Sequence, residues 1–228
     1  MTFNQIKMAL YSTFLTNWYG LKLRKIKVLK ERKRVRVEYC ASLLETLNIE
    51  VKVINQQNIP QNGNYLLASN HRTIIDPLII EVATKDHNIQ GYWIAKKELY
   101  DSFFFGLFVR NAGTILIDRE ASQMGAFFKE IKQKVKEGDS IYIFPEGTRN
   151  KSDEFLGEFK SGSQLIAMKN RLDILPVYIR NRADKILAEA IADSSVRRVV
   201  EIEFGNLISY KDRELPLQER YKKTFNIT

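Results

Sequence analysis

The chain contains 228 residues, 44% of them hydrophobic, and carries a formal net charge of +9 at pH 7. This length and composition suit one α/β domain with a full hydrophobic core, and no repeat or low-complexity linker divides the sequence. The single cysteine, Cys40, excludes an internal disulfide and fits a reducing compartment. Cys40 shares a helical spacing with Leu43, Leu44 and Leu47, which predicts packing rather than a role as a nucleophile.

Residues 3–47 are predicted to be helical, as two helices broken near residues 17–20. Within the first helix, residues 8–21 carry no charge and include tryptophan, tyrosine, phenylalanine and leucine. These 14 residues are too few to span a bilayer, which takes about 20 apolar residues. No small-residue cleavage site follows them, and the basic residues lie on the wrong side for a signal peptide.

Residues 22–36 follow directly and hold nine basic residues against Glu31 alone, so this stretch carries +8 of the net +9. The charge is therefore predicted to belong to an N-terminal appendage, residues 1–47, rather than to the catalytic body, residues 48–228. An aromatic apolar segment next to a basic cluster favours an anchor that lies on an anionic membrane surface. Two alternatives stay open: a solvated basic helix that covers its own domain, and a helix that binds nucleic acid.

The body of the chain alternates between strand and helix patterns. Strands are predicted at residues 49–54, at a segment that ends at Ser69, and at 92–95, 114–117, 140–144, 174–179 and 199–204. Helices are predicted at residues 78–84, 122–137 and 162–170, and a turn at 60–64. This alternation predicts a sheet covered by helices on both faces, with the functional motifs in loops at the strand ends.

His71 and Asp76 are the first candidate catalytic pair. An imidazole titrates near neutrality, and a carboxylate beside it fixes its tautomer and stabilises the imidazolium. Residues five apart on a straight helix lie about 140° apart, so the pair can meet only if the segment bends. Pro77 disfavours the α conformation at Asp76 and suits a first helical position, so a helix is predicted to open there. The alternative is that Asp76 only caps this helix and His71 is a buried loop histidine.

Three further segments accompany this pair, in the order of the blocks of a known family. Residues 70–77, 113–119, 144–149 and 174–179 resemble the four blocks of the 1-acyl-glycerol-3-phosphate (lysophosphatidate) acyltransferases, and we name them the first to fourth motifs. The resemblance extends from about Ile49 to Phe204 and departs at Leu116, where an aromatic residue is usual. It implies the glycerolipid acyltransferase fold, a mixed sheet flanked by helices with an N-terminal helical pair.

The resemblance also implies a reaction, in which the free hydroxyl of a lysophosphatidate attacks an acyl thioester. His71 would accept the hydroxyl proton and return it to the thiolate, with Asp76 as the group that orients the imidazole. No Gly-x-Ser-x-Gly segment is present, which favours direct transfer without an acyl-enzyme. Ser69 is a weaker candidate nucleophile and is better interpreted as a strand-end hydroxyl.

The acceptor carries a phosphate, and the third motif offers groups to hold it. Gly147 permits close backbone approach, Thr148 and Arg149 supply donors, and Glu146 would contact the glycerol or orient a cation. The family places Arg119 at the acceptor site, against the alternative of a local ion pair with Asp118. Two lysines resemble further phosphate-binding positions. They are Lys96, with Lys97 as the alternative, and Lys160.

Three other features have less specific interpretations. Residues 103–109 are rich in phenylalanine and are expected to pack in the core, although an exposed part would line the acyl site or dip into lipid. Pro176 is expected to end a strand or lie on an edge strand, and the family assigns the fourth motif to the acyl site. His87 lies in a polar run and is expected to be solvated.

Together these patterns predict an acyltransferase that forms phosphatidate by acylating the sn-2 hydroxyl of lysophosphatidate. Its cosubstrate would be an acyl-carrier-protein (acyl-ACP) or coenzyme A (acyl-CoA) thioester, with no cofactor and no metal. The protein would be peripheral or monotopic at the cytoplasmic face of the cell membrane, without a nucleic-acid partner. The alternatives are an acyltransferase for another lysophospholipid or glycerol 3-phosphate and, more remotely, a non-catalytic basic membrane-binding module.

Overall fold

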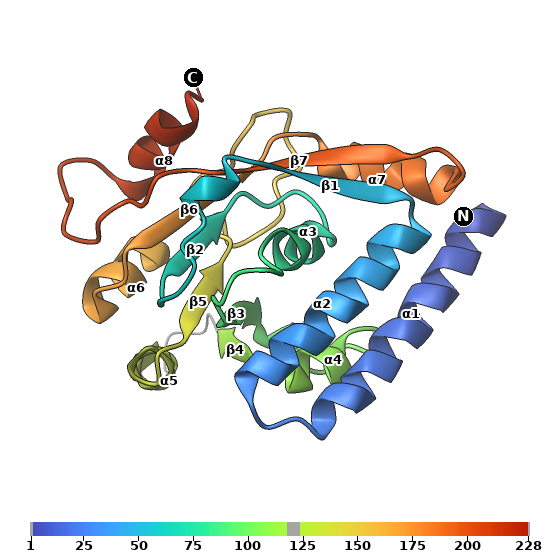
Figure 1. Cartoon of the computed structure of the whole chain (residues 1–228), viewed down its shortest axis with the longest axis horizontal. Helices are drawn as coiled ribbons and strands as arrows, with labels where there is room; N and C mark the ends of the chain where they lie inside the picture. The colour runs from blue at the N-terminus through green and yellow to red at the C-terminus, as the bar shows by residue number, and fades with distance from the viewer. Residues whose placement is uncertain (1, 118–123, 228) are drawn as a thin grey trace.

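A computed structural model describes residues 2–117 and 124–227, which form a seven-stranded sheet with helices on both faces (Figure 1). The strands are β1 (Ile49–Ile54), β2 (Leu66–Ser69), β3 (Gly91–Lys96), β4 (Thr114–Ile117), β5 (Ser140–Ile143), β6 (Ile174–Ile179) and β7 (Arg198–Phe204). The α-helices are α1 (Phe3–Arg24), α2 (Leu29–Thr46), α3 (Asp76–Ala83), α4 (Gly106–Asn111), α5 (Met124–Lys136), α6 (Ser161–Asn170), α7 (Ala183–Ala192) and α8 (Leu217–Phe225). Short 3₁₀ turns, η1 (Gln56–Asn58) and η2 (Lys97–Leu99), follow β1 and β3. The predicted mixed sheet flanked by helices is confirmed.

The strand order β1-β7-β6-β2-β5-β3-β4 determines where the motifs meet. Strands β6, β2, β5, β3 and β4 are all parallel, whereas β6 pairs antiparallel with β7. The carboxyl ends of the five parallel strands therefore share one edge of the sheet. The first, third and fourth motifs follow or contain β2, β5 and β6, three adjacent strands, so the topology brings them together at that edge.

Alternating side chains of the central strands pack against two separate helical layers. Leu66 and Ala68 of β2 belong to a hydrophobic cluster with α5 and α6, whereas Leu67 belongs to a cluster with α1, α2 and α3. All three side chains are fully buried. A strand buried on both faces is the pattern expected in a parallel sheet, and it explains the continuous apolar run at the end of β2.

The two N-terminal helices are part of this core and not an appendage, which corrects the expectation from the charge distribution. Leu15, Tyr19 and Leu23 of α1 share one buried cluster with Ile79 of α3 and Ile202 of β7. In Figure 1, α1 and α2 lie side by side along one side of the molecule. The N-terminal helical pair is therefore confirmed as an element of the fold, while its role on a membrane stays a prediction.

The predicted break near residues 17–20 is wrong, because α1 continues to Arg24 and α2 begins at Leu29. Gly20 does not interrupt the helix but lets it approach α4. A Cβ at Gly20 would lie 2.9 Å from the backbone nitrogen of Phe108. The glycine is thus a packing residue, and the chain reverses at residues 25–28 instead.

Two basic residues of the stretch 22–36, Lys33 and Arg36 of α2, have buried side chains. The Lys33 Nζ donates to the carbonyl oxygens of Thr84, His87 and Ile89 at 2.9, 2.8 and 2.7 Å. Arg36 is also buried and ion-paired with Glu81. Helix α2 therefore covers its own domain, as the alternative of a basic helix expected, but these two side chains are buried and not solvated. The expectation that His87 is solvated is wrong, since its side chain is buried beside this contact.

Pro176 lies inside the buried strand β6, so the expectation of a strand end or edge is also wrong. It pairs with Ala68 of β2 on one side, while the pairing with β7 on the other side begins only at Val177. A missing N–H at Pro176 therefore removes no bond from the β6–β7 ladder.

Of the phenylalanine-rich residues 103–109, the first three, which we call the phenylalanine segment, are exposed, whereas Phe108 packs against the core as expected. Phe103 is 81% exposed, and Phe104 and Phe105 are also exposed. These rings lie directly before α4, which packs against α1.

Candidate active site

His71 follows β2 in a bent, non-helical connection that ends where α3 begins at Asp76. The His71 Nδ1 lies 2.8 Å from Oδ2 of Asp76. The same oxygen accepts the backbone N–H groups of Arg72 and Thr73 at 2.6 and 2.8 Å. These donors precede α3, so Asp76 closes the connection and does not merely cap its own helix. The predicted bend and contact are confirmed.

The geometry indicates which imidazole nitrogen is available for chemistry. Asp76 is 1% exposed, and its carboxylate oxygen defines Nδ1 as the protonated nitrogen that donates to it. This leaves Nε2 as the acceptor, and the side chain is 17% exposed. The arrangement is that of a general base whose tautomer is held by a buried carboxylate.

Phe144, the first residue of the third motif, lies flat against the imidazole. The ring centroids of His71 and Phe144 are 3.9 Å apart, with an interplanar angle of 12°. Phe144 directly follows β5, the strand next to β2. Sequence reasoning assigned no role to this ring, although its place at the end of the neighbouring strand is the signal that points to it.

Glu146 holds the backbone of the catalytic loop. Its Oε1 accepts the His71 N–H at 2.8 Å, and its Oε2 accepts the Gly157 N–H at 2.9 Å. The carboxylate is buried, and this burial raises the pKa of Glu146 above its ordinary value. Both oxygens are thus engaged with backbone, which differs from the expectation that Glu146 contacts the glycerol or orients a cation.

Further hydrogen bonds tie His71 to its surroundings. The Asn150 N–H donates to the His71 carbonyl oxygen at 2.7 Å, and the Arg72 guanidinium donates to the carbonyl oxygens of Ser152 and Glu154. The Asn70 side chain exchanges two hydrogen bonds with the backbone of Ile179, at 3.0 and 2.8 Å. The first, third and fourth motifs therefore form one connected loop cluster.

The residues predicted to bind the phosphate differ in whether they already have an ion-pair partner. Gly147 adopts φ 68°, a left-handed conformation that favours glycine, and the next two residues, Thr148 and Arg149, are exposed. Arg149 makes no ion pair with any residue that the structure describes. Lys96 ends β3 and is exposed.

Lys160 is exposed and pairs with Glu158 at 2.7 Å, while its backbone N–H donates to the Pro145 carbonyl oxygen at 2.8 Å. Its position therefore adjoins the third motif. Arg119 and Asp118 lie outside the described residues.

Ser69 is not placed to act as a nucleophile. Its side chain is fully buried, and its hydroxyl lies 3.4 Å from Oδ1 of Asn70. The interpretation as a strand-end hydroxyl is confirmed. Within residues 2–117 and 124–227, no group of three histidine, cysteine or carboxylate side chains is arranged to hold a metal ion.

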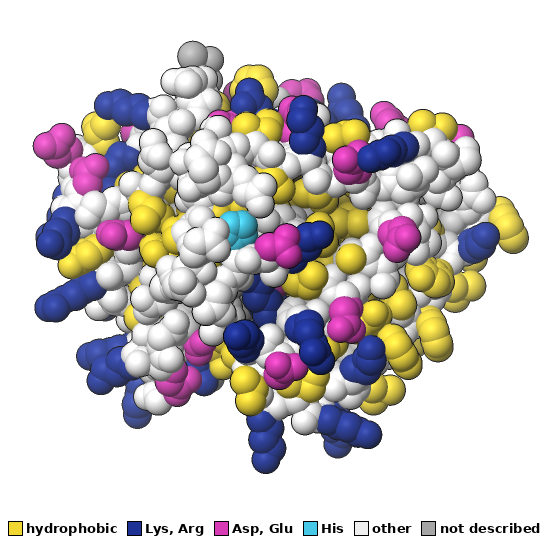
Figure 2. All heavy atoms as spheres, viewed as in Figure 1, with side chains coloured by type: hydrophobic (Ala, Val, Ile, Leu, Met, Phe, Trp, Pro, Cys, Tyr) yellow, Lys and Arg dark blue, Asp and Glu magenta, His cyan; other side chains and the backbone are white. Residues whose placement is uncertain are grey.

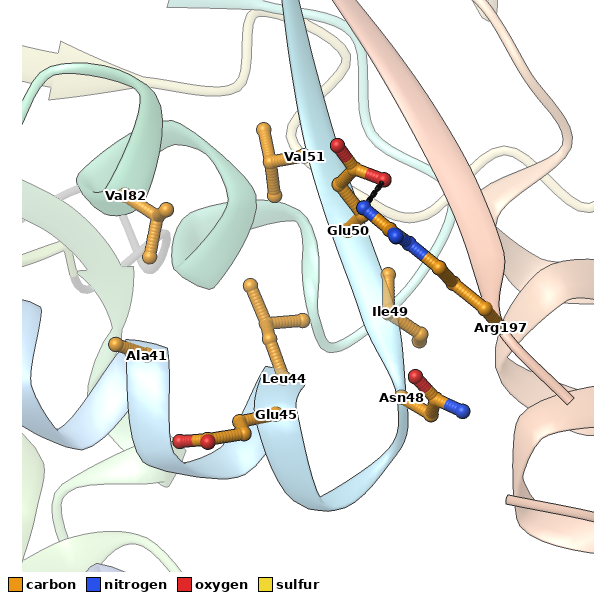
Figure 3. Close-up of a pocket in the computed structure, with 9 residues that line it drawn as sticks. All are labelled: Ala41, Leu44, Glu45, Asn48, Ile49, Glu50, Val51, Val82 and Arg197. Carbon is orange, nitrogen blue, oxygen red and sulfur yellow. Dashed lines mark hydrogen bonds and ion pairs between the residues drawn. The ribbon is translucent and has the colours of Figure 1, made fainter. Parts of the chain in front are cut away.

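A surface hollow lies elsewhere, between the end of α2, the start of β1 and α3 (Figure 3). It is lined by Ala41, Leu44, Glu45, Asn48, Ile49, Glu50, Val51, Val82 and Arg197. The close-up shows Glu50 and Arg197 joined by an ion pair at one side of it. No predicted site residue lines this hollow, so the catalytic pair belongs to a different part of the surface.

One side of α1 presents large apolar side chains to solvent. The exposed large apolar residues that recur at spacings of three or four are Phe3, Ile6, Leu10, Phe14, Trp18 and Leu21, which we call the α1 stripe. Figure 2 shows hydrophobic side chains along α1 and Lys and Arg side chains around its C-terminal end. Among the residues that the structure describes, every helix is too short or too polar to span a membrane.

Known proteins with similar sequences are acyltransferases. The family model described as Acyltransferase matches residues 50–180, which contain the catalytic pair and the third motif. The chain is 33% identical over 171 residues to the 1-acyl-sn-glycerol-3-phosphate acyltransferase of Helicobacter pylori, covering 72% of this chain and 71% of that protein. It is 34% identical over 172 residues to the Streptococcus pneumoniae protein of the same name, covering 75% and 60%.

The fold is similar to the crystal structure of the 1-acyl-sn-glycerophosphate (LPA) acyltransferase PlsC from Thermotoga maritima. The TM-score is 0.69, with 19% sequence identity, and the superposition covers 98% of this chain and 92% of that one. The likeness extends over the N-terminal helices as well as the sheet.

Proposed function

Because the chain belongs to the acyltransferase family, we propose that it acylates the sn-2 hydroxyl of lysophosphatidate and so produces phosphatidate. The observation that carries the proposal is the His71–Asp76 contact at 2.8 Å, at the sheet edge where exposed cations gather. The relatives named for this reaction supply the acceptor class. The loop cluster supplies the chemistry.

The reaction would proceed in two steps, and Nε2 of His71 would hold the proton between them. The acceptor hydroxyl gives its proton to Nε2 of His71 as its oxygen attacks the thioester carbonyl carbon, forming a tetrahedral adduct. The adduct then collapses, the carbon–sulfur bond breaks, and the thiolate takes the proton back from Nε2. Asp76 stabilises the imidazolium between the two steps, because its buried carboxylate carries the opposite charge.

Exposed cations would hold the acceptor phosphate near His71. Arg149 is the strongest candidate, since its guanidinium matches phosphate oxygens and is not ion-paired within the described part of the chain. Lys96 and Lys160 would add charge, and Arg119 stays a proposal from the family resemblance. Positioning of this kind supplies several kcal/mol of a barrier.

The acyl donor would be a thioester of acyl carrier protein or coenzyme A. Both present the same carbonyl and the same thiolate leaving group to His71, so the proposed chemistry serves either. Measuring rates with each donor at a fixed acceptor concentration would assign the physiological thioester class.

An acceptor panel with one fixed thioester tests the proposed function. Lysophosphatidate should be acylated faster than glycerol 3-phosphate and than lysophospholipids whose phosphate carries a head group. Arg149→Ala should raise KM for lysophosphatidate, whereas Arg171→Ala, an exposed arginine at the end of α6, should not. Activity confined to acceptors without a terminal phosphomonoester would contradict the phosphate site.

A membrane surface would be the place where this reaction occurs. The α1 stripe and the phenylalanine segment are exposed, and α1 packs against α4, which follows that segment. Lysines and arginines beside α1 would attract anionic head groups, while the apolar rings enter the interface. We propose that the protein is peripheral or monotopic at the cytoplasmic face of the cell membrane.

Vesicle sedimentation tests this placement. The double variant Leu10→Ser with Phe14→Ser should bind anionic vesicles several-fold more weakly than the parent chain. Leu207→Ser, an exposed leucine after β7, is the control and should bind normally. Undiminished binding by the double variant would show that another surface contacts lipid.

A further inference from the structure

Two aromatic rings lie behind the catalytic imidazole and form a stack of three with it. The His71 ring lies on Phe144 at 3.9 Å and 12°, and Phe144 in turn stacks on Trp93 at 5.2 Å and 25°. The three side chains come from the loop after β2, the loop after β5, and β3. Because β2, β5 and β3 are neighbouring strands, these rings line up on one face of the sheet, where Trp93 and Phe144 pack against the cluster that includes α3.

A buried carboxylate holds the far end of this stack. The Trp93 Nε1–H donates to Oε1 of Glu81 at 2.8 Å, and the Arg36 Nε–H donates to the same oxygen at 2.8 Å. Arg36 and Glu81 are each 2% exposed. The Arg36 guanidinium also donates to the carbonyl oxygens of Ala112 and Gly91, at 2.6 and 3.3 Å.

This network fixes the plane of the indole. Rotation of the Trp93 ring would break a buried hydrogen bond to a charged acceptor, which is among the stronger hydrogen bonds in proteins. The ion pair joins α2 to α3, and the remaining Arg36 bonds join α2 to the start of β3 and to the loop before β4. The indole is therefore tied to several elements at once.

The catalytic histidine needs such a support. Among the residues that the structure describes, the imidazole makes a side-chain hydrogen bond only to Asp76, which restrains the ring within its own plane but leaves it free to swing about the Nδ1···Oδ2 line. A near-parallel ring on its face removes that motion and aims Nε2. An aromatic face also attracts the imidazolium that forms when the proton is taken.

We propose that Trp93 and Glu81 are positioning residues for acyl transfer, acting through Phe144 on the orientation of His71. Neither touches the reacting atoms. The inference rests on the proposed function only in using His71 as the base, and the identity of the acyl acceptor does not enter it. It adds to the motif residues a support that the four motifs do not include.

A substitution series separates positioning from general stability. Trp93→Phe keeps a ring but removes the donor to Glu81, and Trp93→Leu removes the ring. Tyr142→Phe is the matched control: it removes a buried hydrogen bond to the Ile89 carbonyl oxygen, at 2.7 Å, from a ring that contacts Trp93 edge-on. Its own ring remains in place.

Trp93→Phe should lower kcat by about 10-fold and Trp93→Leu by about 100-fold, because small misplacements of a base cost this much. KM for the acceptor should stay within about twofold, since the expected loss lies in positioning the base rather than in binding. Tyr142→Phe should keep kcat near the parent value even where its unfolding midpoint falls as far as that of Trp93→Phe.

The hydrogen bond itself can be observed in solution. The chain has two tryptophans, so in a Trp18→Phe background the indole N–H resonance belongs to Trp93. This resonance should exchange slowly with solvent in the parent. It should exchange faster in the double variant Arg36→Met with Glu81→Met, which removes both buried charges together and should lower kcat like Trp93→Phe.

Two results would overturn the inference. Equal losses of kcat in Trp93→Phe and Tyr142→Phe at equal stability would reduce Trp93 to a structural residue, and a raised KM at unchanged kcat would make it a substrate contact. If the parent fails to acylate lysophosphatidate, the proposed function fails separately. The comparison of the two variants then still decides the positioning role with whichever acceptor the parent uses.

Discussion

The backbone N–H of His71 donates to Oε1 of Glu146 at 2.8 Å, while the His71 ring is held by Asp76. The first motif therefore orients its own base through Asp76, and the third motif fixes the backbone that carries the base. The two carboxylates therefore act on different parts of one histidine, Asp76 on its ring and Glu146 on its backbone. Variants of the two residues should for that reason have different effects.

Asp76→Asn should separate charge from geometry in the catalytic pair. Since Oδ2 of Asp76 receives all three hydrogen bonds, an asparagine oxygen in that place can keep them, but the negative charge is lost. We expect kcat to fall on the order of 10²–10⁴-fold with KM little changed, and His71→Ala to fall at least as far. Steady-state kinetics checks this.

His87→Gln is the control for that pair, because His87 is the other histidine and lies outside the loop cluster. Its kcat should remain at the parent value. An active His71→Ala enzyme would refute the proposed base.

Glu146→Gln should destabilise the loop cluster. An amide offers one oxygen where the carboxylate offers two, so its NH₂ group would face a backbone N–H donor from His71 or Gly157. We expect the free energy of unfolding to fall by about 1–3 kcal/mol. Urea unfolding at neutral pH measures the difference.

The same variant should change the pH dependence of stability. Burial raises the pKa of Glu146 above its ordinary value of 4.5, so between the two values the folded chain binds more protons than the unfolded chain. The part of the stability that depends on protonation of Glu146 is complete below 4.5 and is lost as the pH rises through the folded pKa. The unfolding free energy of the parent minus that of Glu146→Gln should therefore decrease as pH rises. Parallel curves for the two proteins would contradict the shift.

Gly157→Ala should impair catalysis from a position that touches no substrate. A Cβ at Gly157 would collide with Oε2 of Glu146, and the buried carboxylate has little room to retreat. We expect kcat to fall by about 10-fold as the His71 backbone shifts. Gly162→Ala is the matched control, since a Cβ there meets nothing within 4 Å, and it should retain full activity.

Lys33→Met should lower the free energy of unfolding more than Lys30→Met does, at the other lysine of α2. It would leave three buried carbonyl oxygens, of Thr84, His87 and Ile89, without their shared donor. We expect a loss of about 2–3 kcal/mol in the free energy of unfolding. Lys30→Met, at an exposed position of the same helix, should change it by less than about 0.5 kcal/mol. Similar losses for both would contradict the buried contact.

Most strands and the catalytic bend were predictable from the sequence, because both depend on local patterns. The alternation in residues 49–54 and the apolar run before Ser69 define β1 and β2, and Pro77 defines the start of α3. The first, third and fourth motifs supplied the neighbourhood of His71. Local signals of this kind survive folding because the surrounding structure reinforces them.

Burial of single charged side chains was not predictable, since it depends on which helix face meets the sheet. Lys33 and Arg36 stand among exposed lysines and arginines in one basic run, and only the packing of α2 on α3 separates them. The roles of Glu146 and Trp93 were missed for a related reason. Each acts through a partner far away in sequence, His71 and Glu81 respectively.

Helix α1 has one exposed apolar face and one buried face. Side chains of the α1 stripe point to solvent, while Leu15, Tyr19 and Leu23 complete the core beneath the sheet. A ligand that binds only the folded form of a protein raises the free energy of unfolding by mass action. Any lipid surface that α1 binds in this conformation therefore acts as a stabilising ligand of the whole domain. The melting temperature would then depend on lipid concentration, and the exposed apolar side chains of α1, when covered by lipid, would help to keep the whole domain folded.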